Sequence, residues 1–231
     1  MKNKLASLGL LLFIFFAVSC SGTDKNKIPE TLIAGKESKK TESSKKKSKK
    51  KILTKDPANE KKGKTKVLEN RADDLYDYAL QKGYSTKYCF LVDMSIPGGR
   101  KRFFVYDLED KSVAWSGLVA HGCCNEDFIA HPRFSNASGS GCSSLGKYKI
   151  GEFYHGQYGK SYRLHGLDKT NSNAYNRAVV IHGFDCVPDE EIYPRVLCNS
   201  FGCAMVSYNF FDRLSRIINK SDKPILLWIY R

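Results

Sequence analysis

The chain has 231 residues and a formal net charge of +14, with 38 Lys and Arg against 24 Asp and Glu. Such a charge is typical of nucleic-acid-binding proteins, but residues 1–70 hold 18 basic and 7 acidic residues, a net +11, which leaves only +3 for residues 71–231. The charge therefore belongs to the beginning of the chain, and a folded part so close to neutral argues against nucleic acid as its partner.

The first twenty residues have the pattern of an export signal. Two lysines precede an uncharged run from Leu5 to Ser19, and small residues lead directly into Cys20. The run is shorter than the ~20 residues that a membrane-spanning helix needs. We therefore predict a signal peptide over residues 1–19, which directs the protein out of the cytoplasm.

Cys20 stands at the expected cleavage point, an arrangement that resembles the cleavage box of bacterial lipoproteins. The resemblance implies acylation of Cys20, whose lipid then holds the protein on a membrane. Ser21 is not the aspartate-type signal for inner-membrane retention, so we expect a periplasmic protein anchored to the outer membrane. The alternative is an ordinary signal peptide that ends near a cysteine by coincidence.

The segment 20–70 is rich in lysine, contains no aromatic residue and offers almost nothing to bury. Such a composition predicts a disordered tether between the lipid and the folded domain. Runs of lysine also bind anionic polymers or lipid head groups, but a solvated spacer is the simpler interpretation.

Residues 71–231 are enough for one domain with a hydrophobic core. The apolar spacing predicts a helix over 71–83, with Gly83 as its stop. Short runs rich in β-branched and aromatic residues then predict strands at 88–94, 101–109, 112–120, 146–154, 162–167 and 177–183. An amphipathic helix over 208–220 and a buried strand over 224–230 end the chain. The predicted fold is mainly β, a sandwich or barrel-like sheet with a few helices.

A candidate catalytic pair follows from the end of the chain. The strand that ends in His182 and Gly183 is followed, after a loop, by Gly202 and Cys203. If the two side chains meet, the imidazole can take the thiol proton, and the backbone N–H groups of Gly202 and Cys203 can stabilise a tetrahedral oxyanion. The alternative is a structural thiol and a core histidine.

The cysteines are odd in number once Cys20 is lipidated: seven remain, so at least one is free. If Cys203 is that one, the other six allow fifteen pairings, although the adjacent Cys123 and Cys124 cannot easily bridge each other. No pair has the C-x2-C spacing of a zinc site, and we expect neither a metal nor a cofactor. The sequence does not predict the oligomeric state.

Several blocks of the sequence resemble, in order, the YkuD-type L,D-transpeptidases, and in particular the lipoprotein-like murein L,D-transpeptidase branch. The resemblance runs from about Tyr84 to Arg231, through "YCFLVDMSIPGGRKRFFVYDL", "GLVAHG", "FSNASGSGCSSLGKYKIGEFYHGQYGKSYRLHGLD", "NRAVVIHG" and "SFGC". It implies an enzyme of the cell envelope that acts on peptidoglycan stem peptides, either forming 3→3 crosslinks or trimming the terminal D-alanine.

The resemblance also implies roles for individual residues. Cys203 is expected to be the nucleophile and His182 the general base, with the carbonyl of Gly183 orienting the imidazole. Residues expected to border the substrate are Ser200, Phe201, His121 and Ser144. For His121 a core or surface position is an equal alternative, and Ser144 can also belong to an ordinary turn beside glycine.

The chain departs from the family pattern around the cysteine. Phe201 stands where the wider family has histidine, Ala204-Met205 follows the cysteine, and Asn199 replaces an arginine of the branch. The last change removes a cation that could pair with a substrate carboxylate. These departures keep an alternative open, a non-catalytic lipoprotein that retains the fold and binds peptidoglycan.

Overall fold

The computed structural model describes residues 57–231, all of which belong to one compact unit, Ile52–Arg231. The predicted signal peptide, the lipid-bearing Cys20 and the first part of the predicted tether, residues 20–56, lie outside the described residues, so they remain predictions.

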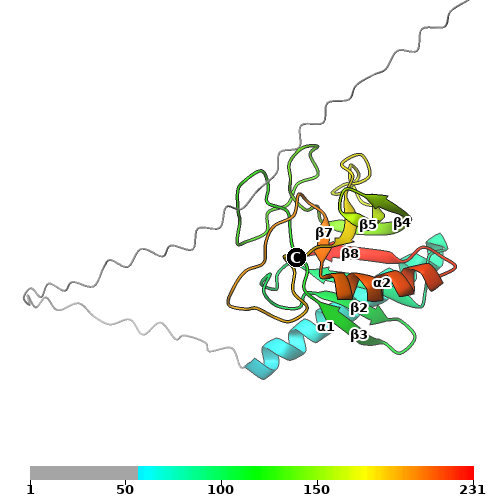
Figure 1. The fold of residues 1–231 in the computed structure, drawn as a ribbon. Coiled ribbons are helices and arrows are strands. Elements are labelled where there is room, and N and C mark those ends of the chain that lie inside the picture. Colours follow the sequence, from blue (N-terminus) through cyan, green and yellow to red (C-terminus); the bar gives the residue numbers. More distant parts are fainter. Residues whose placement is uncertain (1–56) are drawn as a thin grey trace, which may run out of the picture. The chain divides into compact units, whose positions relative to one another are not determined.

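The described part of the chain is built on one mixed sheet of eight strands in the order β3-β2-β1-β8-β4-β5-β6-β7 (Figure 1). Neighbouring strands are antiparallel except for β1 with β8 and β6 with β7, which are parallel. The bounds are β1 Tyr88–Asp93, β2 Phe103–Asp107, β3 Ser112–Gly117, β4 Gly146–Gly156, β5 Gly159–Gly166, β6 Val180–Gly183, β7 Ala204–Val206 and β8 Leu226–Tyr230, with helices α1 Pro57–Lys82 and α2 Tyr208–Lys220.

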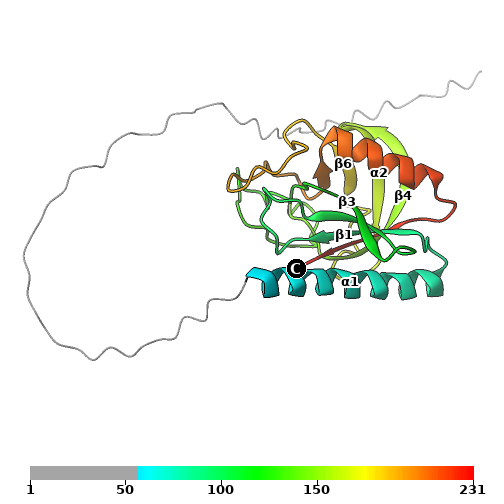
Figure 2. The ribbon, with the colours of Figure 1, turned by 90° about the horizontal axis from the view of Figure 1, so that it is seen from below.

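The two helices cover opposite faces of this sheet (Figure 2). Along β1, side chains alternate between the faces: Phe90 and Val92 join the main core with α2, whereas Cys89 and Leu91 pack against α1. The prediction of a mainly β fold with a few helices is confirmed, and every predicted strand coincides with an observed one to within a few residues. The long loops gather at one end of the sheet, beside β6 and β7 (Figure 1).

Helix α1 begins earlier than predicted, at Pro57 rather than Arg71, so residues 57–70 are helical and not part of a disordered tether. The physical reason is that the apolar stripe of α1 starts before Arg71. Its buried residues, Leu68, Ala72, Leu75 and Ala79, pack against β1, β2 and β8. The first of these residues, Leu68, was not recognised as part of the helix because the sequence before it is rich in lysine.

Strand β7 was missed altogether because three residues give too little pattern to identify a strand. No helix within residues 57–231 is both long enough and apolar enough to span a membrane.

Candidate active site

The parallel pair β6–β7 places Cys203 beside the strand that carries His182. Ile181 pairs with Ala204 and His182 with Met205, so Cys203, directly before β7, lies beside Val180. Because alternate residues of a strand share a face, Val180 and His182 project to the same side. The loop of some twenty residues between His182 and Cys203 therefore returns to place the thiol next to the strand that carries the imidazole.

His182 is buried, with 2 % of its surface exposed, and only its Nδ1 has a hydrogen-bond partner among the described residues. Nδ1 lies 3.0 Å from the carbonyl oxygen of Gly183, which can only accept, so Nδ1 carries the proton of the neutral ring. Burial lowers the pKa of His182, and the bond to Gly183 raises it by less. The ring is therefore held neutral, with Nε2 available as a base. This is the orientation that the carbonyl of Gly183 was expected to give the imidazole.

Tyr158 completes the surroundings of His182 and was not predicted. Its ring stacks on the imidazole, with centroids 4.6 Å apart and an interplanar angle of 16°, and Phe184 meets both rings edge on. Tyr158 comes from the tip of the β4–β5 hairpin, and nothing in its sequence spacing relates it to His182. The stack fixes the tilt of the imidazole and excludes water from one of its faces.

Cys203 is a free thiol, as predicted, and is 8 % exposed. Burial raises its pKa, while a backbone hydrogen bond at Val180 and the charges of Arg177 and Arg163 lower it by less. Since the pKa of His182 is lowered, the two shifts together favour a neutral thiol and a neutral imidazole at rest. The thiolate then forms when His182 takes the proton.

Ser200 organises the loop of residues 199–203, which carries the candidate nucleophile Cys203 and is called the nucleophile loop. Its hydroxyl donates to the carbonyl of Cys203 at 2.8 Å and accepts from the N–H of Gly202 at 3.2 Å. The buried Ser200 therefore stabilises the loop. Its hydroxyl was predicted to face the substrate, but both of its hydrogen bonds are made within the loop. Because the N–H of Gly202 already donates to Ser200, it is not free to bind an oxyanion. Of the two predicted donors, the N–H of Cys203 remains, and it has no acceptor among the described residues. Phe201 is 46 % exposed, so its ring is accessible to a substrate, as predicted for a residue that borders one.

Two disulfides connect the loops around the site. Cys186–Cys198 closes the loop between His182 and Cys203, and Cys124–Cys142 joins two segments that meet the nucleophile loop. Cys89, Cys123 and Cys203 remain free. The predicted exclusion of a Cys123–Cys124 bridge is thereby confirmed. Each crosslink removes conformations from the unfolded chain, which favours one loop arrangement.

His121 has the buried position that was the alternative to a place beside the substrate: it is 2 % exposed and both of its ring nitrogens are engaged. Nδ1 accepts from the guanidinium of Arg102 at 3.0 Å, and Nε2 lies 3.2 Å from the carbonyl oxygen of Ile129. Burial and the charge of Arg102 lower the pKa of His121 to about 4. His121 is therefore a neutral structural histidine.

Asn199, which replaces an arginine of the family branch, has a structural role here. Its side-chain amide accepts from the N–H of Ile129 at 2.7 Å and donates to the carbonyl of the same residue at 3.1 Å. The nucleophile loop is thus paired with the segment after Cys124. A positively charged side chain at this position could not make both bonds.

Ser144 is buried as well, and its hydroxyl lies 2.9 Å from that of Tyr148 and 3.3 Å from Nη1 of Arg177. It was predicted to contact substrate, but its hydroxyl is buried between Tyr148 and Arg177 and helps to fix Arg177. Sequence reasoning did not single out Arg177, which lies five residues before His182. The only signal for it is its presence in the block "NRAVVIHG".

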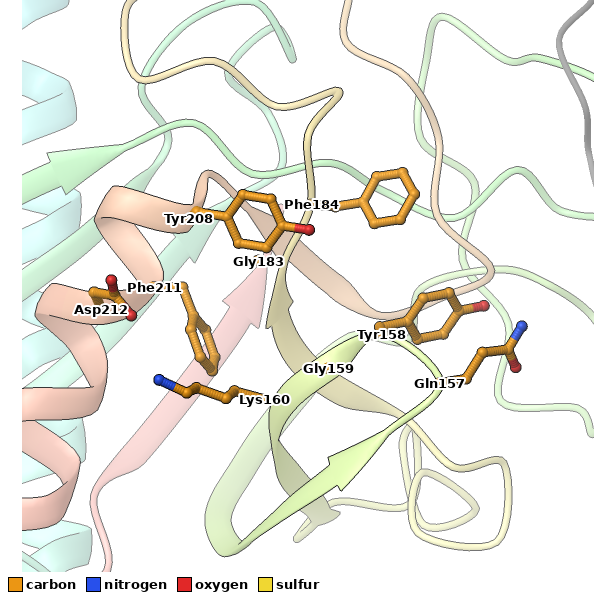
Figure 3. Close-up of a pocket in the computed structure, with 9 residues that line it drawn as sticks. All are labelled: Gln157, Tyr158, Gly159, Lys160, Gly183, Phe184, Tyr208, Phe211 and Asp212. Atoms are coloured by element: carbon orange, nitrogen blue, oxygen red, sulfur yellow. The ribbon is translucent and has the colours of Figure 1, made fainter.

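A cavity of about 530 Å³ opens next to the end of β6 (Figure 3). Gly183 and Phe184 line one part of it, and Tyr158, whose ring stacks on His182, lines another. Figure 3 shows that Lys160 and Asp212 lie together on the side away from Tyr158 and Gln157. The cavity therefore combines aromatic walls with one charge of each sign. Within residues 57–231, no group of three or more His, Cys, Asp or Glu side chains could hold a metal ion.

A family model for the L,D-transpeptidase catalytic domain matches residues 59–230. This chain belongs to that family. The match covers the described domain except for residues 57, 58 and 231, and it confirms the predicted resemblance. Residues 59–230 therefore form an L,D-transpeptidase catalytic domain. A search of curated proteins found no match.

Solved structures with a similar fold include three that differ widely in source. The cell-shape-determining protein Pgp2 of Campylobacter jejuni (K307A mutant) is 14% identical, with a TM-score of 0.43 over 64% of this chain and 48% of its own. An L,D-transpeptidase of Xylanimonas cellulosilytica is 13% identical, with a TM-score of 0.35 over 67% and 68%. One from Mycobacterium smegmatis is 11% identical, with a TM-score of 0.38 over 63% and 59%. The chain thus spans about half of the Campylobacter protein.

Proposed function

We propose that this protein is a cysteine acyltransferase that acts on peptidoglycan stem peptides, with Cys203 as nucleophile and His182 as general base. Two observations carry the proposal: a free thiol directly before β7, which pairs with the strand that bears His182, and an imidazole whose Nδ1 is bonded to Gly183 and whose Nε2 has no partner in the described residues. Membership of the L,D-transpeptidase family supplies the substrate class.

The proposed reaction begins with the neutral pair. Cys203 attacks the carbonyl carbon of the third stem residue while Nε2 of His182 takes the thiol proton, and the N–H of Cys203 donates to the oxyanion. The tetrahedral intermediate collapses, the imidazolium returns its proton to the leaving amine, and D-alanine departs. A thioester remains on Cys203.

The second half of the reaction depends on the acceptor. An amine of a neighbouring stem loses its proton to His182 and attacks the thioester, which gives a 3→3 crosslink and regenerates the thiol. Water in the same position gives a trimmed tripeptide with a free carboxyl group. The cavity lined by Lys160 and Asp212 provides groups that complement the carboxylate and the amine of a stem peptide.

The proposal is tested with the purified full-length chain, a stem tetrapeptide and a carbapenem. We expect released D-alanine, a tripeptide or a crosslinked dimer, and a covalent mass adduct on Cys203. The variant Cys203→Ala should lose all three, whereas Cys89→Ala, which removes a buried free thiol of β1, should keep them. Wild-type protein that forms neither adduct nor product would leave only the fold in common with the family.

The anchor is proposed separately, from the sequence alone. We propose export through residues 1–19 and lipidation of Cys20, which would hold the enzyme on the periplasmic side of the outer membrane. Growth with a labelled fatty acid should label the wild-type chain and not the Cys20→Ser variant. Equal labelling of both would exclude Cys20 as the acceptor.

A further inference from the structure

Arg177 lies in the connection between β5 and β6, and its guanidinium is fixed by three acceptors. Nη1 donates to the carbonyl of Ser135 at 2.9 Å and to the hydroxyl of Ser144 at 3.3 Å, and Nη2 donates to the carbonyl of Cys142. These acceptors come from the segment that precedes β4. A long flexible side chain is thus held in one orientation.

The same guanidinium stands against the nucleophile loop. Gly202 has a φ of +107°, and a Cβ atom placed there would lie 2.7 Å from the carbonyl oxygen of Cys142 and 3.1 Å from Nη2 of Arg177. Only glycine fits so close to both groups. The residue directly before Cys203 therefore touches the carbonyl that Arg177 holds and the guanidinium itself.

The charged and titratable groups around Cys203 come from four elements. His182 lies on β6, Tyr158 at the tip of the β4–β5 hairpin, Arg163 on β5 and Arg177 in the following connection. Arg163 lies over the rings of Tyr154 and Tyr175, at 4.6 and 5.6 Å from their centroids. Arg177 has no such ring contact among the described residues. Besides Cys203, the titratable group whose charge acts on Arg177 is Tyr148 of β4.

Burial of Arg177 matters for the strength of its charge. The side chain is half-buried, and desolvation lowers the pKa of its guanidinium, while the charges of Tyr148 and Cys203 raise it. A charge removed from water is screened less than a surface charge. The positive charge next to Gly202 therefore acts on Cys203 more strongly than an exposed lysine at the same separation.

We propose that Arg177 is a positioning residue for Cys203: its fixed guanidinium supplies the positive charge that favours the thiolate formed when His182 takes the proton. The inference rests on the proposed nucleophilic role of Cys203. It also gives the site a cation although Asn199 has replaced the arginine of the family branch. Here the positive charge near the nucleophile comes from Arg177, in the connection between β5 and β6.

The test measures the thiol and not turnover. Full-length protein is treated with iodoacetamide between pH 6 and 10, and the rate of alkylation of the Cys203 peptide is followed by mass spectrometry. Loss of the charge in Arg177→Gln should move the midpoint of the rate profile to higher pH and slow alkylation at pH 7.5 by roughly 10-fold, since a cation near a thiol favours the thiolate. Arg177→Lys should recover most of the rate.

The control is Arg213→Gln, which removes an arginine of α2 that lies over Trp115. It should leave the profile unchanged. The proposal is overturned if folded Arg177→Gln protein has the wild-type midpoint, or if Arg177→Lys shifts the midpoint as far as Arg177→Gln does. Wild-type protein whose Cys203 is alkylated with the expected pH dependence, but which shows no turnover, would contradict the proposed function and not this role of Arg177.

Discussion

His121 and His182 are equally buried, each with 2 % of its surface exposed, yet their surroundings give them different capacities. Both nitrogens of His121 are engaged, by Arg102 and by the carbonyl of Ile129. His182 is bonded through Nδ1 alone and has an aromatic ring stacked on its face. Burial therefore does not distinguish a candidate general base from a structural histidine, whereas a ring nitrogen without a partner among the described residues does.

The largest expected difference between the two histidines is in activity. His182→Ala should lower kcat/KM for tetrapeptide cleavage by about 10²–10⁴-fold, because the general base is lost. His121→Ala should instead lower the free energy of unfolding by about 1–3 kcal/mol, because Arg102 and Ile129 lose a buried partner. D-alanine release and thermal unfolding measure the two effects. If His121→Ala protein that remains folded loses as much activity as His182→Ala protein, the assignment of His121 to structure is wrong.

Acid should weaken the fold through His121. Its pKa is about 4 in the folded chain and about 6.5 when unfolded, so the unfolded state binds the proton more tightly between these values. Stability contributed by neutral His121 is complete above pH 6.5 and is lost as the pH falls towards 4, by about 3 kcal/mol. Denaturant unfolding at several pH values measures this slope. His121→Phe should flatten it, and an unchanged slope would contradict the buried neutral state.

The smallest expected effect comes from Tyr158, which distinguishes the surroundings of His182 from those of His121. Tyr158→Leu removes a stacking contact worth about 1 kcal/mol and admits water to the imidazole. Because burial lowers the pKa of His182, the variant should raise that pKa and move the acid limb of kcat/KM to higher pH. Tyr175→Leu, which removes the stacked partner of His165, is the matched control and should not move the limb.

Elements with a strong periodic signal were predictable from the sequence. The predicted helix over 208–220 coincides with α2, since its apolar face is clear and Ser207 caps its first turn by accepting from the N–H of Phe210. Strand β7 was not predictable, because it is three residues long and owes its conformation to pairing with β6. The early start of α1 was obscured by lysines around Leu68.

The candidate site divides in the same way. Cys203 and His182 could be named from a motif because they lie close to each other in the sequence and the chain resembles a known family. Tyr158 and Arg177 reach the site from other elements, and only the folded arrangement reveals them. The sequence could not decide between the two expected roles of His121 for a similar reason, since its partner Arg102 lies nineteen residues earlier, and no spacing reports a hydrogen bond.

The buried stripe of α1 has a practical consequence for any truncated form of the protein. Leu68 is the first residue of the helix known to be buried, 8 % exposed, and the side chains described before it are exposed. A chain cut at Arg71, where the sequence alone would place the domain boundary, exposes the apolar surface that Leu68 covers and removes the first half of the helix. A chain that begins at Pro57 keeps the full helix and should express as the more soluble and more stable protein.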